Sequence, residues 1–374
     1  MRENLYMSLY MLFIFLIVLI MEILTPRFTR KEIVFGVRVP YDKVDSEKIV
    51  DIKKKYIRNN LLIGIPFIIL FSLMNYILSG IGVILFTTFG FIFIGFLVYL
   101  MSNREVKRLK EREKWFKGRK QSVIIDTDFS KNRIKSIVSP WLFIIPIIII
   151  AINIILGYSY YDLLSDKVAT HWDFSGNING YQSKSKLLIW EIPLGQIVCT
   201  VIFFIVYKGI GWSKQQINSS NPMASAEKNR IFRRVWSIYM IVYCILINLL
   251  LTMGTIQIFR VFDIGNGFLI IVIVVFLILI FGSVIILSIK LGQGGANIIL
   301  ADEKNKNKFS KENRDDDIYW KFGNTIYYNT DDPSVFIEKR FGIGWTINAG
   351  RPVGMAVYIG MILFIVIVIT AVSL

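Results

Sequence analysis

Long apolar stretches alternate with polar, mostly basic stretches along the whole 374-residue chain. A helix needs roughly 20 mostly apolar residues to cross a bilayer, and the pattern predicts eight such helices. The first apolar stretch is longer than the core of a secretory signal and no small-residue cleavage site follows it, so we expect it to remain as an anchor. The predicted spans cover residues 5–24, 61–79, 81–101, 141–160, 187–207, 235–259, 268–290 and 353–374.

Short strand-like segments occur between the predicted spans. The loop 161–186 contains two of them, Thr170–Phe174 and Tyr181–Ser183, around a turn rich in Gly and Asn, which predicts a hairpin. On the side of the membrane opposite to this loop we expect a small β-containing region and a charged helix that continues the third span. The strand-like segments there are 33–40, 121–129, 326–328 and 335–337. The last two flank a turn, a pattern typical of a hairpin. The charged helix is 102–120, and a polar linker covers 302–317.

The expected fold class is therefore an all-α integral membrane protein. It is an eight-helix transmembrane bundle with a small outer β-hairpin and a small cytosolic β-containing region. We expect four parts, in the order of a three-span region with basic loops, a two-span unit with the hairpin, the sixth and seventh spans, and a linker with β-segments before the last span. Their bounds are 1–139, 140–210, 211–301 and 302–374.

Composition agrees with this pattern. Hydrophobic residues make up 54% of the chain and charged residues only 19%, whereas soluble domains are usually about 25% charged. An ordinary soluble enzyme is therefore disfavoured. Both cysteines, Cys199 and Cys244, lie inside apolar stretches, which favours small core residues and excludes a disulfide scaffold.

The charge distribution predicts the orientation. Of the 43 Lys and Arg residues, 38 lie in every second loop, and loops rich in these residues stay in the cytoplasm. Both termini and the loop 161–186 are then expected outside. The net charge of +16 follows from this topology and from anionic lipid headgroups, so we expect the bilayer as a partner and no nucleic acid.

Few residues offer catalytic chemistry. His171 is the only histidine, which excludes a two-histidine metal site. It could respond to pH or contact a ligand, or simply bond to the hairpin around it. Asp315–Asp317 and Asp331–Asp332 could hold a cation, although salt links to Arg314, Lys339 or Arg340 are the simpler interpretation. We expect no catalytic set, no metal and no cofactor.

Polar residues inside spans are costly and often functional. Glu191 is expected roughly 6 Å below the outer start of the fifth span. We interpret Asn153 and Asn248 as side chains that join helices through hydrogen bonds. Pro66, Pro146 and Pro193 are interpreted as causes of helix kinks. The basic run before the sixth span is expected to contact lipid headgroups through Arg230, Arg233 and Arg234.

Two segments resemble known families. Residues Asp166–Gly176, followed by Gly180-Tyr181 and Ser183-Lys184, resemble the bacterial domain of unknown function 1648, which also occurs in the immunity protein against a sporulation-delaying toxin. The family usually has prolines where this chain has Ser165 and Ala169. The stretch from Asn313 through Asn348 resembles domain of unknown function 5808.

These resemblances imply a protein of the bacterial cytoplasmic membrane. The leading hypothesis is a non-enzymatic sensor or immunity factor that meets membrane-active peptides outside the cell and a regulator in the cytosol. The alternative is a secondary transporter of an unknown solute, with Glu191 and the proline-broken helices as its pathway. The candidate ligand-binding residues are His171, Trp172, Asp173, Gly176, Gly180, Tyr181, Lys184 and Glu191.

Overall fold

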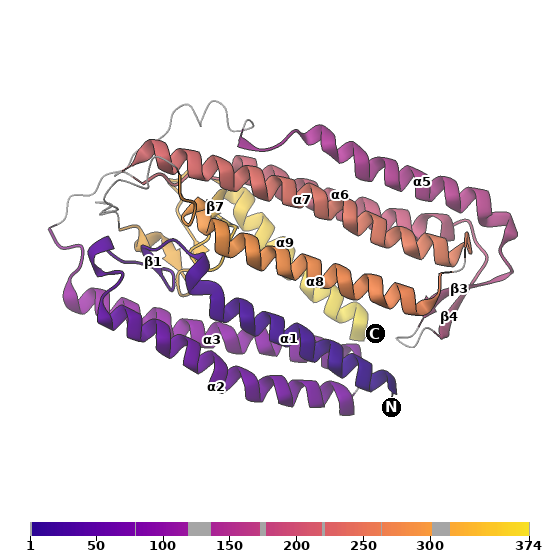
Figure 1. Cartoon of the computed structure of the whole chain (residues 1–374), viewed down its shortest axis with the longest axis horizontal. Coiled ribbons are helices and arrows are strands. Elements are labelled where there is room, and N and C mark those ends of the chain that lie inside the picture. Colours follow the sequence, from indigo (N-terminus) through magenta and orange to yellow (C-terminus); the bar gives the residue numbers. More distant parts are fainter. Residues whose placement is uncertain are drawn as a thin grey trace. The chain divides into compact units, whose positions relative to one another are not determined.

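Helices make up about 70% of this computed structural model (Figure 1). The structure describes residues 2–78, 80–118, 136–172, 177–218, 221–262, 264–300 and 315–373. The long helices are α1 (Arg2–Phe28), α2 (Glu47–Ile77), α3 (Ile81–Glu113), α5 (Ile144–Tyr160), α6 (Leu188–Trp212), α7 (Pro222–Ile258), α8 (Asn266–Leu291) and α9 (Pro352–Ser373). The strands are β1 (Ile33–Val34), β2 (Val37–Arg38), β3 (Lys167–Trp172), β4 (Ile178–Ser183), β5 (Trp320–Lys321), β6 (Ile326–Tyr327), β7 (Phe336–Glu338) and β8 (Trp345–Ile347).

Length and apolar composition allow seven helices of the described chain to cross a membrane, namely α1, α2, α3, α5, α6, α7 and α8. They coincide with the first seven predicted spans. The eighth prediction falls on α9, in which a shorter apolar stretch covers Pro352–Ile367. Many of the large apolar side chains on these helices are exposed, including Ile155 and Ile271, each 62% exposed. Such surfaces fit a multi-pass membrane protein, because hydrocarbon solvates them at no cost.

The chain divides into two compact units. The first contains Met1–Asn132, Trp212–Phe232 and Ile285–Leu374, and the second contains Arg133–Gly211 and Arg233–Val284. In the first unit α1, α2 and α3 pack side by side (Figure 1). Phe15 lies at the centre of their interface, with ring centroids 5.1 Å from Phe91 and 6.2 Å from Phe71.

Short strands at one end of the first unit correct two predictions. The segment 33–40 is a tight hairpin of β1 and β2 rather than one strand, because Phe35 and Gly36 turn with φ of 45° and 78°. The segments 326–328 and 335–337 do not pair with each other: β6 pairs with β5, and β7 pairs with β8.

Asn348 explains the second correction. Its side-chain amide donates to the carbonyls of Asn329, Asp332 and Ser334 at 2.8, 3.2 and 3.2 Å. The loop between β6 and β7 therefore wraps around this side chain instead of closing a hairpin. A parallel bridge between Tyr327 and Asn348 joins the two strand pairs. The predicted strand 121–129 and residues 302–314 of the linker lie outside the described residues.

The second unit is built from α5, α6, most of α7 and α8, and the β3–β4 pair. A 3-10 turn, Pro140–Phe143, leads into α5, and Ser139 caps it by accepting a hydrogen bond from the Trp141 N–H. The Tyr243 hydroxyl on α7 donates to the Leu279 carbonyl of α8 at 2.8 Å. The Gln196 amide of α6 donates to the Asn248 carbonyl of α7 at 2.9 Å.

Candidate functional site

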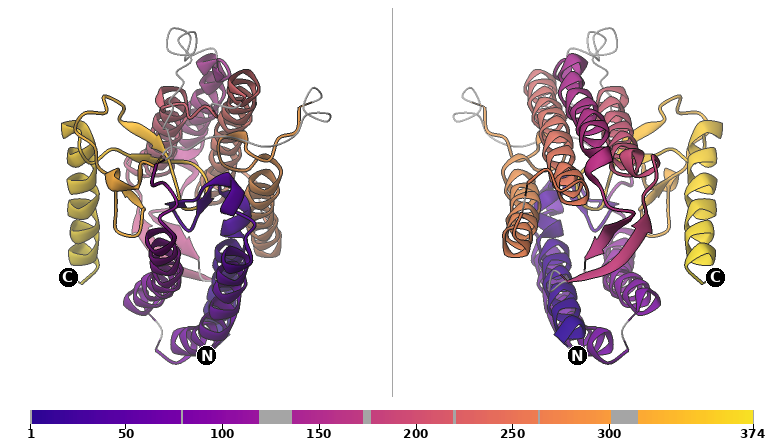
Figure 2. Two further views of the ribbon diagram at one scale, coloured as in Figure 1. Left: turned by 90° about the vertical axis from the view of Figure 1, so that its left-hand side faces the viewer. Right: turned by 90° about the vertical axis from the view of Figure 1, so that its right-hand side faces the viewer.

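The loop 161–186 forms the predicted hairpin in the second unit. Strands β3 and β4 form an antiparallel pair (Figure 2). In its register His171 lies opposite Gly180 and Trp172 opposite Ile178. The register shifts on both sides of His171, which marks an irregular, bulge-like step in the ladder. The candidates Asp173 and Gly176 lie in the segment 173–176, outside the described residues.

Strand β3 anchors the hairpin on the helices. Val168 is buried in an apolar cluster with Leu188 and Ile189 at the start of α6 and with Ile258 and Phe259 at the end of α7. The half-buried Trp172 packs against the same cluster. Burial of these side chains fixes the position of the strand, since each contributes about 1.5–3 kcal/mol when fully removed from water. Trp172 is therefore in part a packing residue.

Lys184 closes the base of the hairpin. Its Nζ donates to the carbonyls of Asp162 and Leu164 at 3.2 and 3.0 Å and lies over the Tyr161 ring, 5.0 Å from the centroid. Its backbone N–H donates to the Asp166 carbonyl at 2.8 Å. The ammonium group thus holds the end of β4 against the segment that follows α5.

His171 bonds within the hairpin. The ring is exposed, and its Nδ1 forms a hydrogen bond with the Asn179 side-chain oxygen. Gly180 faces it across the ladder, and a Cβ atom on Gly180 would lie only 2.7 Å from the Cβ of His171. His171 therefore bonds within the hairpin, which is one of the two alternatives that the sequence allows. Its side chain also requires a glycine at position 180, opposite it in the ladder.

Strand β4 carries the exposed face of the hairpin. Tyr181 is 61% exposed, and the apolar side chains of Leu163 and Leu187 near the base of the hairpin are 77% and 74% exposed. In the described chain β4 pairs with β3 alone. Alternate residues of an edge strand direct their N–H and C=O groups away from the partner strand, where an extended segment can pair with them.

Glu191 is exposed in the first turn of α6. Three amide side chains of this unit, those of Asn153, Gln196 and Asn248, are instead fully buried. Their amide nitrogens donate across the helices, for example from Asn153 to the Thr252 hydroxyl at 2.9 Å and from Asn248 to the Thr200 hydroxyl at 3.1 Å. Their three amide oxygens accept no hydrogen bond from the described residues.

The three arginines before the sixth span differ in their surroundings. Arg230 and Arg234 are exposed, and Arg230 lies 3.7 Å from the Glu227 carboxylate. Arg233 is fully buried and donates to the Ile210 carbonyl at 2.7 Å. The guanidinium of Arg233 therefore contacts the protein interior rather than a lipid headgroup, which differs from the sequence-based expectation for this one residue.

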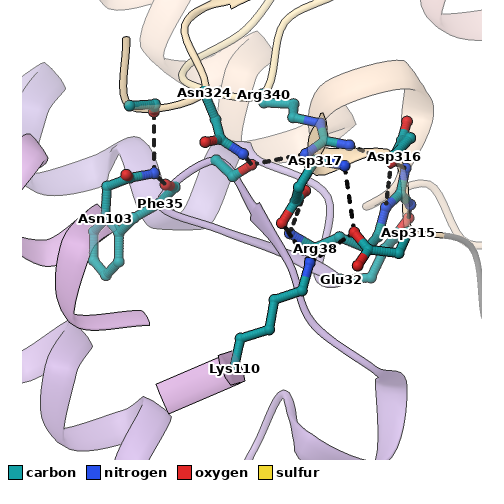
Figure 3. Close-up of polar contacts among 12 residues, drawn as sticks. Glu32, Phe35, Arg38, Asn103, Lys110, Asp315, Asp316, Asp317, Asn324 and Arg340 are labelled. Atoms are coloured by element: carbon teal, nitrogen blue, oxygen red, sulfur yellow. Dashed lines mark hydrogen bonds and ion pairs between the residues drawn. The ribbon is translucent and has the colours of Figure 1, made fainter. Parts of the chain in front are cut away.

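The acidic run in the first unit is engaged in ion pairs (Figure 3). Arg340 bonds to the carboxylates of Asp316 and Asp317 and donates to the Gly36 carbonyl at 3.1 Å. Arg38 lies 3.3 Å from Asp316, and Lys110 lies 2.6 Å from Asp317. This supports the salt-link interpretation for Arg340. The sequence did not single out Arg38 and Lys110, because nothing local to them signals partners more than 200 positions away.

Asp332, from the second acidic pair, is also buried and paired. Burial alone raises the pKa of its carboxyl, but hydrogen bonds from Lys214 at 2.7 Å and from the Ser334 N–H at 3.0 Å outweigh that, so its pKa lies below the usual value. The Tyr327 hydroxyl donates to the same carboxylate at 3.0 Å, and burial raises the pKa of this phenol. Asp332 therefore stabilises the loop between β6 and β7 as a carboxylate.

Comparison with known families agrees with this description. A domain of unknown function (DUF1648) matches residues 148–197, which cover part of α5, the hairpin and the start of α6. A family of unknown function (DUF5808) matches residues 330–355, from the Asp332 loop into α9. No curated protein and no solved structure matches the chain. The chain thus has the features of a multi-pass membrane protein and carries both of these segments.

Proposed function

We propose that the protein is a non-enzymatic sensor or immunity factor that binds membrane-active peptides through the β3–β4 hairpin. The observation that carries this proposal is the exposed strand β4, with Tyr181 on its surface and a free edge in the described chain. Apolar side chains flank the base of the hairpin, so an amphipathic peptide lying in the membrane interface could contact both.

The proposal includes the location of the protein. The positive-inside rule puts the hairpin and both termini outside the cytoplasmic membrane of a bacterium. The ion-paired segments of the first unit would then lie in the cytosol, where a regulator could contact them. A rigid base suits a binding role, because Lys184 and the cluster around Val168 fix the hairpin before any peptide arrives.

Tyr181→Ala tests the proposal. In cells that depend on the protein for survival under membrane-active peptides, we expect this variant to lower the tolerated peptide concentration at least fourfold, since a large exposed contact is lost. Tyr328→Ala is the matched control, because Tyr328 is 43% exposed and belongs to the first unit, not to the hairpin. Equal protection by wild type and Tyr181→Ala, at equal protein levels, would count against peptide binding at the hairpin.

A secondary transporter is the second candidate. The three buried amide oxygens of Asn153, Gln196 and Asn248 favour this candidate. Uncharged oxygens buried between helices can bind a partly dehydrated solute or cation. Proteoliposome uptake of candidate solutes should fall in Gln196→Leu and persist in Leu194→Ala, a change at an exposed position of the same helix. Uptake unaffected by Gln196→Leu and by Glu191→Gln would remove this candidate.

A further inference from the structure

A cavity of about 270 Å³ lies in the first unit, where α1 ends and the β1–β2 hairpin begins. Four cations line it and one carboxylate, Asp45, joins them. The rest of the lining is mainly apolar or backbone. The cationic lining residues are Arg27, Arg30, Lys31 and Lys53.

Three of these four cationic side chains can still bind an anion. Arg30 is engaged, because it pairs with Glu338 at 2.8 Å and donates to the Gln216 carbonyl at 3.1 Å. Arg27, Lys31 and Lys53 form no side-chain hydrogen bond or ion pair with the described residues. Lys53 is half-buried, and an ammonium group out of water is costly unless an anion faces it. Asp45, the one carboxylate among the lining residues, attracts Lys53, so a single carboxylate faces the three cations. The lining therefore favours an anion.

The neutral polar groups of the lining are already satisfied. The Thr29 hydroxyl lies 3.3 Å from the Ile33 carbonyl, to which it donates, and the Asn297 amide donates to the Arg27 and Ile289 carbonyls at 3.2 and 2.9 Å. These bonds fix the walls of the cavity. A ligand would thus be recognised by charge and by apolar contact rather than by the neutral side chains.

The apolar part of the lining restricts the ligand further. Ile33, Val34, Phe35 and Val44 are buried and form one wall beside the cations. The cavity also lies at the end of the apolar helix α1, whose length and composition allow it to cross a membrane up to Phe28. Lipid headgroups lie beside the ends of such helices. A cationic group beside an apolar wall suits a molecule that carries a phosphate next to hydrocarbon.

We propose that this cavity binds a phosphate group, and that the phosphate belongs to the headgroup of an anionic phospholipid. Arg27, Lys31 and Lys53 provide the charge, and the wall around Val34 contacts the glycerol end of the lipid. This site is independent of the hairpin and of the peptide binding proposed there. It is also distinct from Arg230 and Arg234, which are exposed on α7.

The test is a thermal-stability titration of the full-length protein in a zwitterionic detergent with added phosphatidylglycerol. A ligand that binds only the folded state raises Tm with its concentration, so wild type should show a saturable rise. Phosphatidylcholine should give none. The double variant Lys31→Gln/Lys53→Gln should need about 25-fold more phosphatidylglycerol or show no rise, since each cation near an anionic lipid contributes about fivefold.

The matched control is Lys54→Gln/Lys117→Gln, which removes the same charge from two exposed positions outside the cavity. It should respond as wild type does. If the double variant fails to fold, Lys31→Gln alone takes its place, because Lys31 is exposed. A wild type that shows no saturable rise, a cavity variant that responds like wild type, or a control that loses the response equally would overturn the proposal.

Inorganic phosphate and glycerol phosphate distinguish the source of the anion. Under the proposal neither reproduces the rise at millimolar concentration, because both lack the hydrocarbon that the apolar wall contacts. If inorganic phosphate alone gives the full rise, and the cavity variant abolishes it, the lipid assignment is overturned and the cavity binds free phosphate.

Discussion

Two residues of the hairpin, Gly180 and Lys184, have structural roles that few other residue types could fill. Gly180 faces His171 so closely that no side chain fits between them, and Lys184 uses its ammonium group to hold the base. Both residues belong to the motif from which the resemblance to the family was drawn. Their contacts give that motif a structural reason that holds whether or not the hairpin binds a ligand.

Gly180→Ala should loosen the hairpin. The added methyl group would overlap the Cβ of His171, and such overpacking costs about 1–3 kcal/mol. We expect faster trypsin cleavage after Lys167, Lys184 or Lys186 in the variant. Gly195→Ala is the control, since a Cβ there meets open space. Cleavage at the wild-type rate in Gly180→Ala would show that the strands can separate without cost.

The paired carboxylate of Asp332 should make the stability of the folded protein depend on pH. Its pKa in the folded protein lies below the unfolded value of about 3.9. The stabilisation is therefore present above about pH 4 and is lost as the pH falls through the lower, folded pKa. Asp332→Asn should lower Tm near neutral pH and flatten the acid limb of the profile of Tm against pH. Parallel profiles for variant and wild type would contradict this role.

At the scale of elements, the hydrophobic pattern predicted the helices better than it predicted which strands pair. The positions of seven long helices and the hairpin of β3 and β4 follow from local sequence. Strand pairing in the first unit did not, because strands of two or three residues carry almost no periodicity. Their partners are chosen by distant contacts, such as those of Asn348 with the loop around Asp332.

Arg340 holds several of these elements together, and its removal should be costly. The side chain is 2% exposed and bridges the segment before β5 to the β1–β2 turn. Breaking a buried ion pair leaves charges unpaired and typically costs about 3–5 kcal/mol, so Arg340→Met should lower the free energy of unfolding by about 3 kcal/mol. Lys55→Met, which breaks the exposed pair with Glu105, should cost below about 1 kcal/mol. Similar losses in denaturant titrations of both variants would refute the distinction.

At the scale of the whole molecule, charge and hydropathy indicate the class of protein, whereas specific chemistry needed the structure. The 38 basic residues in alternate loops predict an orientation, but they do not show which cations are available. The structure does: Arg233 is buried, Arg340 is paired, and Lys31 and Lys53 line a cavity. Sequence alone could not separate these roles, because each depends on partners that are far away along the chain.

The central claim is that the hairpin faces outward while the basic segments of the first unit face the cytosol. Membrane-impermeant maleimide labelling of single variants tests it directly, with Lys186→Cys at the base of the hairpin and Lys117→Cys after α3, both at exposed positions. Wild type provides the background, because Cys199 and Cys244 lie within α6 and α7. We predict that Lys186→Cys is labelled in intact cells and that Lys117→Cys is labelled only after permeabilisation. Labelling of Lys117→Cys in intact cells, with Lys186→Cys protected, would contradict the account.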